Sequence, residues 1–173
     1  MPKQFLKLTT RAGYGKYLFN DWRFDAEGNP REDFVLNNPR YQNRQVLLTR
    51  ENFGSGSSRE HAAWALLDYG FRALIAPSFA DIFFNNCIKN GILPVRLAAF
   101  DVDYLFENED LEIVIDLPSQ TVSAGNINSP FEIDDFRKNI LLKGLDSISL
   151  TLKLDSYISA YEASKHTIIP ARR

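Results

Sequence analysis

The strongest constraint on the fold is a repeated alternation of short apolar runs with helical patterns in the centre of the chain. Three runs, VLLT (46–49), ALIA (73–76) and ILPV (92–95), have the length and composition of buried β-strands. Between them apolar residues recur at helical spacing, and Gly70 and Gly91 are placed to end the two helices. Strands and helices in alternation predict an α/β fold.

Each of the two helices has an expected start and an expected inner face. The first is predicted from about Ser58 to Tyr69, and the second opens at Pro77 and Ser78, where Ser78 and Asp81 have the spacing of a capping box. The residues expected to face the core are Ala62, Ala65, Leu66 and Tyr69 in the first helix, and Phe79, Ile82, Phe83 and Cys87 in the second. Cys87 is therefore interpreted as a core residue.

The C-terminal half adds a polar helix (99–108), an alternating strand, a hairpin and more helices. LEIVIDL (111–117) predicts a half-buried strand with Leu111, Ile113, Ile115 and Leu117 on one face and Glu112, Val114 and Asp116 on the other, and Ala124-Gly125-Asn126 predicts a hairpin turn. The segment DDFRKNILLKG (134–144) predicts a helix with Phe136, Ile140 and Leu141 inward and Gly144 as its stop. The tail after it predicts two further helical pieces.

Residues 1–45 differ from the rest because they lack regular periodicity and are rich in Gly, Asn, Arg and aromatic residues. They are predicted to form a long loop with short helices, and long irregular stretches in compact domains often carry function. We therefore predict one α/β domain over residues 1–173. Residues 1–45 form its irregular loop region, and residues 46–173 form the core and the C-terminal helices.

Composition and charge narrow the class of protein. Hydrophobic residues make up 45% and charged residues 24%, which is an ordinary globular balance. A net charge of -2 argues against nucleic acid as a partner. No apolar run approaches the ~20 residues that span a bilayer, so no membrane association is predicted. The single cysteine excludes an internal disulfide and a cysteine-bound metal cluster, and it favours the cytoplasm.

A glycine- and serine-rich loop follows the first predicted strand, where residues 52–67 read NFGSGSSREHAAWALL. A strand followed by a glycine-rich turn and a helix is typical of anion-binding sites. The first N–H groups of a helix are unpaired, and the helix dipole favours negative charge there. Gly54 and Gly56 permit positive φ and close backbone approach. A third glycine of the dinucleotide fingerprint and the Lys-Ser/Thr pair of a phosphate loop are missing, so a nucleotide is not predicted.

Three interpretations of this loop remain open: a helix cap, an anion cradle and a catalytic serine. Ser57 to Glu60 fit a capping box, with Ser57 at the N-cap and Glu60 three residues later. A cation is disfavoured at a helix start, so Arg59 suggests a bound anion. His61 is interpreted first as structural, and the second histidine, His166, is too distant in sequence to suggest a metal site.

The same stretch carries a resemblance to a known family. The run from GSGSSREH through ILPV is similar to the swivelling domain of the aconitase superfamily, which implies a three-layer β/β/α architecture. KQFLK, GYGKYLFNDWRF and GLDSISLTL narrow the resemblance to the small subunit of bacterial 3-isopropylmalate dehydratase. The resemblance extends over essentially the whole chain.

The family implies a chemistry that fits these residues. Its enzymes move a hydroxyl group between adjacent carbons by dehydration and rehydration in leucine biosynthesis. By resemblance, Ser57 is the catalytic base, and Ser58 and Arg59 bind a substrate carboxylate. The family also implies a [4Fe–4S] cluster on a separate large subunit, with which this chain would form a heterodimer. No cofactor is expected on this chain itself.

The resemblance leaves several points open. Family members carry a segment ending in Asp-Thr-Asp-x-Ile-Ile-Pro before Lys-Gln-Phe-Leu, whereas here Met1-Pro2 precedes Lys3, and we expect lower stability from its absence. A dicarboxylate substrate needs further cations, so Arg11 is predicted to bind it, with Lys7 as the alternative.

The small subunit of a homoaconitase or of a citraconate- or methylmalate-hydrating enzyme is an alternative function. A non-catalytic carboxylate-binding module is another.

Overall fold

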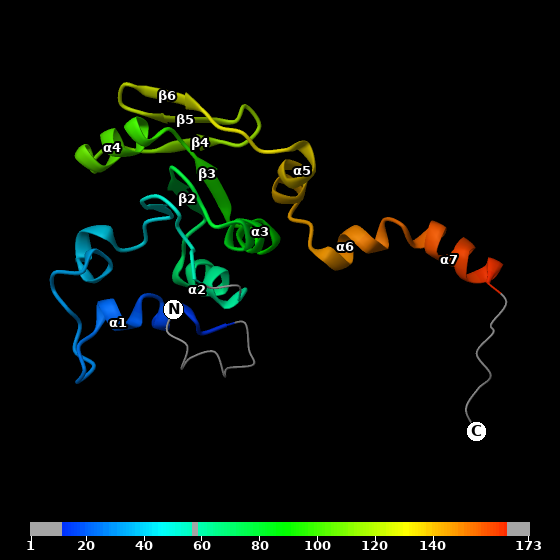
Figure 1. Ribbon diagram of the computed structural model, residues 1–173, viewed down its shortest axis with the longest axis horizontal. Helices are drawn as coiled ribbons and strands as arrows, with labels where there is room; N and C mark the ends of the chain where they lie inside the picture. The colour runs from blue at the N-terminus through cyan, green and yellow to red at the C-terminus, as the bar shows by residue number, and fades with distance from the viewer. Residues whose placement is uncertain (1–11, 57–58, 166–173) are drawn as a thin grey trace.

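The structure is a computed structural model that describes residues 12–56 and 59–165. The described part of the N-terminal region is a chain of loops with short helical pieces, as predicted. These pieces are η2 (Gly15–Tyr17), α1 (Asn20–Arg23), η3 (Val35–Asn37) and η4 (Pro39–Tyr41). They lie beside the regular elements in Figure 1 and are connected by turns, which explains the absence of sequence periodicity.

The centre of the molecule is a parallel sheet of three strands in the order β1 (Val46–Leu48), β2 (Ala73–Ala76) and β3 (Leu93–Arg96). The connections contain α2 (His61–Tyr69) and α3 (Asp81–Lys89), so the predicted alternation is confirmed. All four residues of β2 are buried because it is the central strand. The strand β1 was predicted to be buried, but its residues are only half-buried because it lies at the sheet edge.

The two faces of β2 contact different layers. Leu74 and Ala76 belong to a core cluster with α2 and α3, whereas Ile75 packs with α4 (Ala99–Glu107) and with β5. The second sheet is antiparallel and consists of β4 (Val114–Asp116), β5 (Thr121–Ala124) and β6 (Ile127–Pro130). Figure 1 shows this sheet on one side of the parallel sheet and α2 with α3 on the other. The arrangement agrees with the predicted β/β/α layers.

Several details of the helices differ from the predictions. The helix α3 begins at Asp81, and the Ser78 hydroxyl accepts a hydrogen bond from the Asn52 N–H instead of capping the helix. Ile82 is exposed, because the inner face of α3 consists of Phe83, Phe84, Cys87 and Ile88. Phe136 is also exposed, whereas Ile140 and Leu141 pack against the core as predicted.

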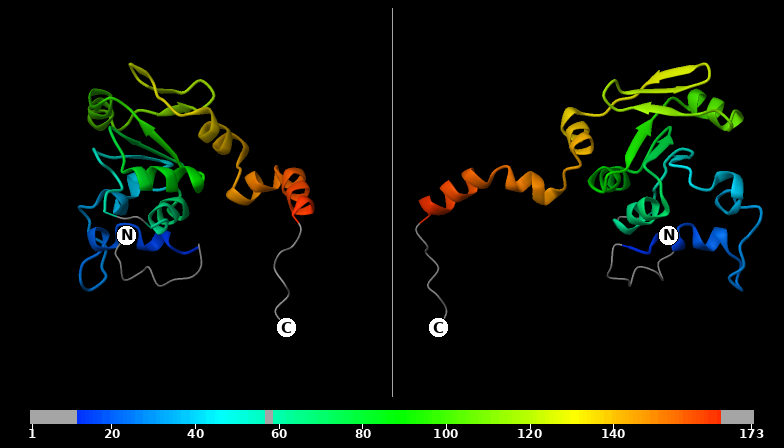
Figure 2. Two further views of the ribbon diagram at one scale, coloured as in Figure 1. Left: turned by 45° about the vertical axis from the view of Figure 1, so that its right-hand side comes forward. Right: turned by 180° about the vertical axis from the view of Figure 1, so that it is seen from behind.

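The C-terminal elements extend from the layered body. The helix α5 (Asp135–Lys143) packs near α3 and ends at Gly144, which is in the left-handed conformation. The predicted two helical pieces are α6 (Ser147–Leu152) and α7 (Asp155–Ser164). We call residues 146–165 the C-terminal arm. Figures 1 and 2 show from three directions that this arm stands away from the sheets.

Candidate functional site

The glycine–serine loop lies at the carboxyl end of the parallel sheet, between β1 and α2. Phe53 forms a parallel bridge with Phe79, which follows β2. The Phe53 N–H donates to the Ser78 carbonyl at 3.1 Å, and the Ala80 N–H donates to the Phe53 carbonyl at 3.0 Å. Ligands of α/β folds bind at this edge, because loops from neighbouring strands meet there. These backbone bonds anchor the entry to the loop.

The two glycines of the loop have different structural roles. Both have positive φ, +83° at Gly54 and +92° at Gly56. A Cβ at Gly54 would lie 2.1 Å from Cγ of Phe83, whereas no atom of the described residues lies within 4 Å of a Cβ at Gly56. Gly54 therefore permits the loop to pass directly over the aromatic core, and Gly56 supplies only the backbone conformation.

The start of α2 differs from the predicted capping box. The helix begins at His61, so Glu60 occupies the N-cap position and makes no side-chain cap bond. Its carboxylate instead accepts hydrogen bonds from Lys89 at 3.1 Å and from the Asn90 amide at 2.8 Å. The Asn90 side-chain oxygen in turn accepts the Trp64 indole N–H at 2.9 Å. This network fixes the start of α2 against the end of α3.

His61 is the first residue of α2, and it is held among aromatic rings. Its ring lies 5.3 Å from that of Tyr14 and 4.5 Å from that of Trp64, measured between centroids. The His61 Nδ1 atom is buried, and no described residue forms a hydrogen bond with it. Ring packing, and not a hydrogen bond at Nδ1, therefore sets the place of this histidine.

The predicted site residues divide into those that the structure places and those outside its described part. Gly54 lies against Phe83 of α3, Glu60 and His61 form the start of α2, and Arg59 is exposed just before it; Gly56 is exposed at the end of the described part of the loop. The residues Ser57, Ser58, Arg11 and Lys7 lie outside the described residues. Three residues with structural roles around α2 were not predicted: Asp68 lies on α2 and bonds to the backbone of Gly13 and Gly15, and Tyr14 and Asn90 contact α2 from other elements. The Gly-Tyr-Gly pattern at 13–15 is the one local signal for Tyr14.

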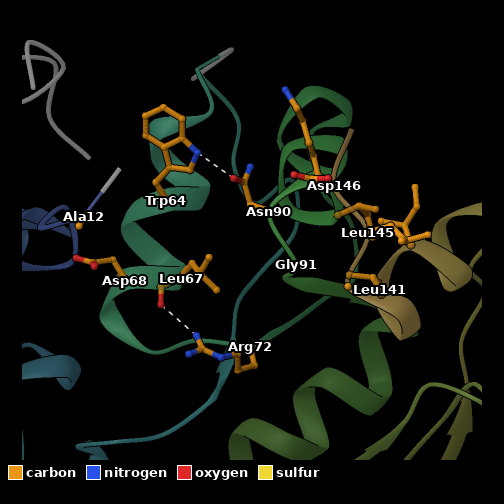
Figure 3. Close-up of a pocket in the computed structure, with 14 residues that line it drawn as sticks. Ala12, Trp64, Leu67, Asp68, Arg72, Asn90, Gly91, Leu141, Leu145 and Asp146 are labelled. Atoms are coloured by element: carbon orange, nitrogen blue, oxygen red, sulfur yellow. Dashed lines mark hydrogen bonds between the residues drawn. The ribbon is translucent and has the colours of Figure 1, made fainter. Parts of the chain in front are cut away.

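A groove of about 640 Å³ lies elsewhere, between α2, α3 and α5 (Figure 3). Its walls combine Trp64, Leu67 and Leu141 with the polar groups of Asp68 and Asn90. None of the described residues of the glycine–serine loop lines it. The loop itself is at the surface, with Ser55, Gly56 and Arg59 exposed. The candidate site is therefore an open surface on this chain.

The described residues contain neither a reactive thiol nor a group of metal ligands. Cys87 is a core residue, as predicted, and burial raises the pKa of its thiol well above the usual range, so it stays protonated. Within residues 12–56 and 59–165 no three His, Cys, Asp or Glu side chains are grouped to hold a metal ion. No helix in these ranges is both long and apolar enough to cross a membrane.

Comparison with known proteins identifies the class to which this fold and loop belong. Residues 1–100, more than half of the chain, match the aconitase C-terminal domain family. The 3-isopropylmalate dehydratase small subunit of Brevibacillus brevis is 53% identical over 170 residues, which cover 95% of this chain and 88% of the relative. The chain therefore belongs to the 3-isopropylmalate dehydratase small-subunit family.

A solved structure supports the same assignment. The crystal structure of a 3-isopropylmalate dehydratase from Methanocaldococcus jannaschii superposes with a TM-score of 0.60 at 25% identity. The superposition covers 94% of this chain and 88% of that one. The fold similarity thus extends beyond the first 100 residues, over the second sheet as well.

Proposed function

We propose that this chain is the small subunit of a 3-isopropylmalate dehydratase and contributes half of an active site that interconverts 2- and 3-isopropylmalate. The observation that carries the proposal is the 53% identity over 95% of the chain to a small subunit of this name. The position of the GSGSSREH loop at the carboxyl edge of the parallel sheet supports it, because groups there are presented outward.

In this proposal Ser57 is the general base. Its alkoxide removes a proton from carbon next to a substrate carboxylate, the hydroxyl group leaves, and water returns to the adjacent carbon. A serine oxygen has an unperturbed pKa far above neutrality, so it requires hydrogen-bond donors and positive charge nearby. The N-terminal end of α2, which carries the positive end of the helix dipole, and the exposed Arg59 are suited to that role.

Ser58, Arg59 and Arg11 are proposed to hold the carboxylates of the substrate. A guanidinium group binds a carboxylate through two parallel hydrogen bonds, which fixes orientation as well as charge. Gly54 and Gly56 shape the loop, and Glu60 and His61 set the start of the helix that follows it. Residues 1–45 are proposed to lie on the substrate side of a single swivelling domain over residues 1–173.

The partner in this proposal is a large subunit that carries a [4Fe–4S] cluster. The cluster supplies Lewis-acid assistance to the departing hydroxyl group. This chain has one cysteine, which is buried, so it does not provide the three thiolates that a cluster of this kind requires. A heterodimer completes the open surface described above, and one buried thiol fits a reducing compartment such as the cytoplasm.

The test of the function is reconstitution with the large subunit encoded by the same organism. We expect the two chains to purify together and to convert 2- into 3-isopropylmalate, while each chain alone is inactive. Turnover of homoaconitate, citraconate or methylmalate with no turnover of the isopropylmalates would assign the alternative substrate class. A complex that binds dicarboxylates without turning any over would identify a binding module.

The test of the base is Ser57→Ala in the reconstituted complex, with Ser55→Ala as the matched control in the same loop. We expect Ser57→Ala to reduce kcat by ~10²-fold or more, because a general base contributes at least that factor. Ser55 is exposed and contributes its backbone N–H to the Asn52 carbonyl, so its side chain is dispensable. Equal turnover of both variants at a temperature where both are folded would assign the base to another group.

A further inference from the structure

The helix α2 holds a tight turn of the N-terminal region through one carboxylate. Oδ2 of Asp68 accepts hydrogen bonds from the Gly15 N–H at 2.7 Å and from the Gly13 N–H at 3.1 Å. These groups are 53 and 55 residues apart in sequence. Figure 3 shows the Asp68 side chain pointing from α2 toward the segment that contains Ala12. The bonds are charge-assisted, which makes them stronger than bonds between neutral groups.

The turn fits closely against α2 at this point. A Cβ at Gly15 would lie 2.7 Å from the Tyr69 backbone nitrogen, so only glycine permits this approach. Gly13 has a φ of +88°, in the left-handed region. The carboxylate of Asp68 and the two glycines therefore define where the backbone on each side of Tyr14 lies.

Tyr14 transmits this position to the start of α2. Its side chain is fully buried, and its ring meets those of His61 and Trp64 edge-on, with centroids 5.3 Å and 5.9 Å away. Among the described residues the buried Nδ1 of His61 has no hydrogen-bond partner, so the contacts with them that orient the histidine are those of the rings. His61 directly follows the Ser57-Ser58-Arg59-Glu60 segment in the chain.

We propose that Asp68 is a positioning residue for the dehydratase reaction. It fixes the Gly13–Gly15 turn, the turn places the Tyr14 ring, and that ring holds His61, from which the chain leads directly back to Arg59 and the proposed base. This rests on the proposed function, in which the loop supplies the base and the carboxylate-binding groups. Asp68 itself lies at the opposite end of α2 from that loop, and it acts only through the turn and the ring.

The kinetic test uses Asp68→Ala and Asp68→Asn in the complex with the large subunit, with Asp155→Ala on α7 as the control. A small displacement of a catalytic group reduces turnover strongly, so we expect Asp68→Ala to lower kcat by roughly tenfold at a temperature where it is folded. Asp68→Asn retains an acceptor oxygen and should recover most of the lost kcat. Because the same loop is proposed to bind the substrate carboxylates, KM should rise in Asp68→Ala as well, and Asp68→Asn should restore both parameters.

Two kinetic results would overturn the proposal. One is Asp68→Ala with the kcat of wild type, and the other is Asp68→Asn with the same loss as Asp68→Ala, since then the acceptor oxygen is not what matters. Absence of turnover in the wild-type complex would instead refute the proposed function, and this outcome is separate.

Hydrogen exchange then tests the positioning without any enzyme activity. In Asp68→Ala we expect faster amide exchange at residues 12–17 and also in the peptide that contains residues 54–61, with Asp155→Ala unchanged in both. Faster exchange at 12–17 alone would mean that the turn does not support the loop, and the proposal would be wrong.

Discussion

The layered body and the C-terminal arm both contain large apolar side chains, but many of those in the body are buried, whereas most of those in the arm are exposed. In the body, Leu74 is completely buried in β2, whereas Leu152 in α6 is 63% exposed and Tyr157 in α7 is 75% exposed. Both regions place apolar side chains at regular spacing. The difference is that the body offers a second surface to cover them, whereas the described part of the arm stands away from both sheets (Figures 1 and 2).

Regular spacing of apolar residues along a helix therefore does not determine whether their side chains are buried. Helices as short as α6 and α7, with 6 and 10 residues, are marginal in water without tertiary contacts. In the body, by contrast, α2 and α3 have 9 residues each and are stabilised by packing on the parallel sheet. Stability should therefore be concentrated in the body, and this expectation can be tested with matched substitutions.

The largest effect is expected from truncating a leucine in the body. Leu74→Ala removes a buried side chain between β2 and the two helices, which costs about 2–5 kcal/mol of unfolding free energy. The matched substitution in the arm, Leu152→Ala, should change it by less than about 0.5 kcal/mol, because that side chain already contacts water. Urea denaturation of both variants measures the difference. Equal losses of unfolding free energy would mean that the arm packs against the body and unfolds together with it.

A second comparison uses two glycines with positive φ. Gly54→Ala and Gly144→Ala should each lose about 1–2 kcal/mol from the left-handed backbone. Gly54→Ala should lose about 1–3 kcal/mol more, because its Cβ overlaps the Phe83 ring, whereas a Cβ at Gly144 meets no described atom within 4 Å. Thermal denaturation followed by circular dichroism gives the two values. Similar melting temperatures would show that the Phe83 ring can move aside.

A smaller effect is expected from two equivalent helix caps. Asp134 accepts the Arg137 N–H at 3.0 Å in α5, and Asp146 accepts the Ser149 N–H at 2.7 Å in α6. Replacing Asp134 by Ala should cost about 0.5–2 kcal/mol of global stability. Replacing Asp146 by Ala should leave global stability nearly unchanged and reduce helical signal in the arm. A global loss from Asp146→Ala equal to that from Asp134→Ala would contradict the comparison.

The smallest effect is a dependence of stability on pH at the Asp134 cap. Hydrogen bonds from the Arg137 backbone and side chain lower the pKa of Asp134, so the folded state favours the carboxylate. The stabilisation is then present above the unfolded pKa of about 3.9 and is lost as pH falls through the folded pKa. Asp134→Asn keeps a capping oxygen without the charge. Its stability should therefore approach that of wild type below about pH 4; a constant difference between pH 3 and 7 would exclude this role.

Much of the fold follows from patterns that depend only on nearby residues. The strand at 73–76, the turn at Gly125 and the helix stops at Gly70 and Gly144 were all predicted from local apolar runs and backbone preferences. They could be predicted because a strand, a two-residue turn or a left-handed cap is determined within a few residues. The glycine–serine loop and its likeness to the aconitase family were likewise visible in the chain alone.

What only the tertiary structure decided is which surfaces meet. The helical pattern of α3 placed Ile82 inside, but the sheet contacts the face of Phe84 and Ile88, so Ile82 is exposed. Glu60 has the spacing of a capping residue, yet it bonds to Lys89 and Asn90 because α3 ends beside it.

The contacts that support the candidate site were also decided only by the tertiary structure. Asp68 and the Gly13–Gly15 turn are more than 50 residues apart, and the residues between them carry no sign of that contact. Local sequence determines the elements of this protein because backbone conformation depends on short-range sterics and hydrogen bonds. The packing of those elements determines the neighbours of each side chain, because contacts between distant segments exist only once the chain has folded.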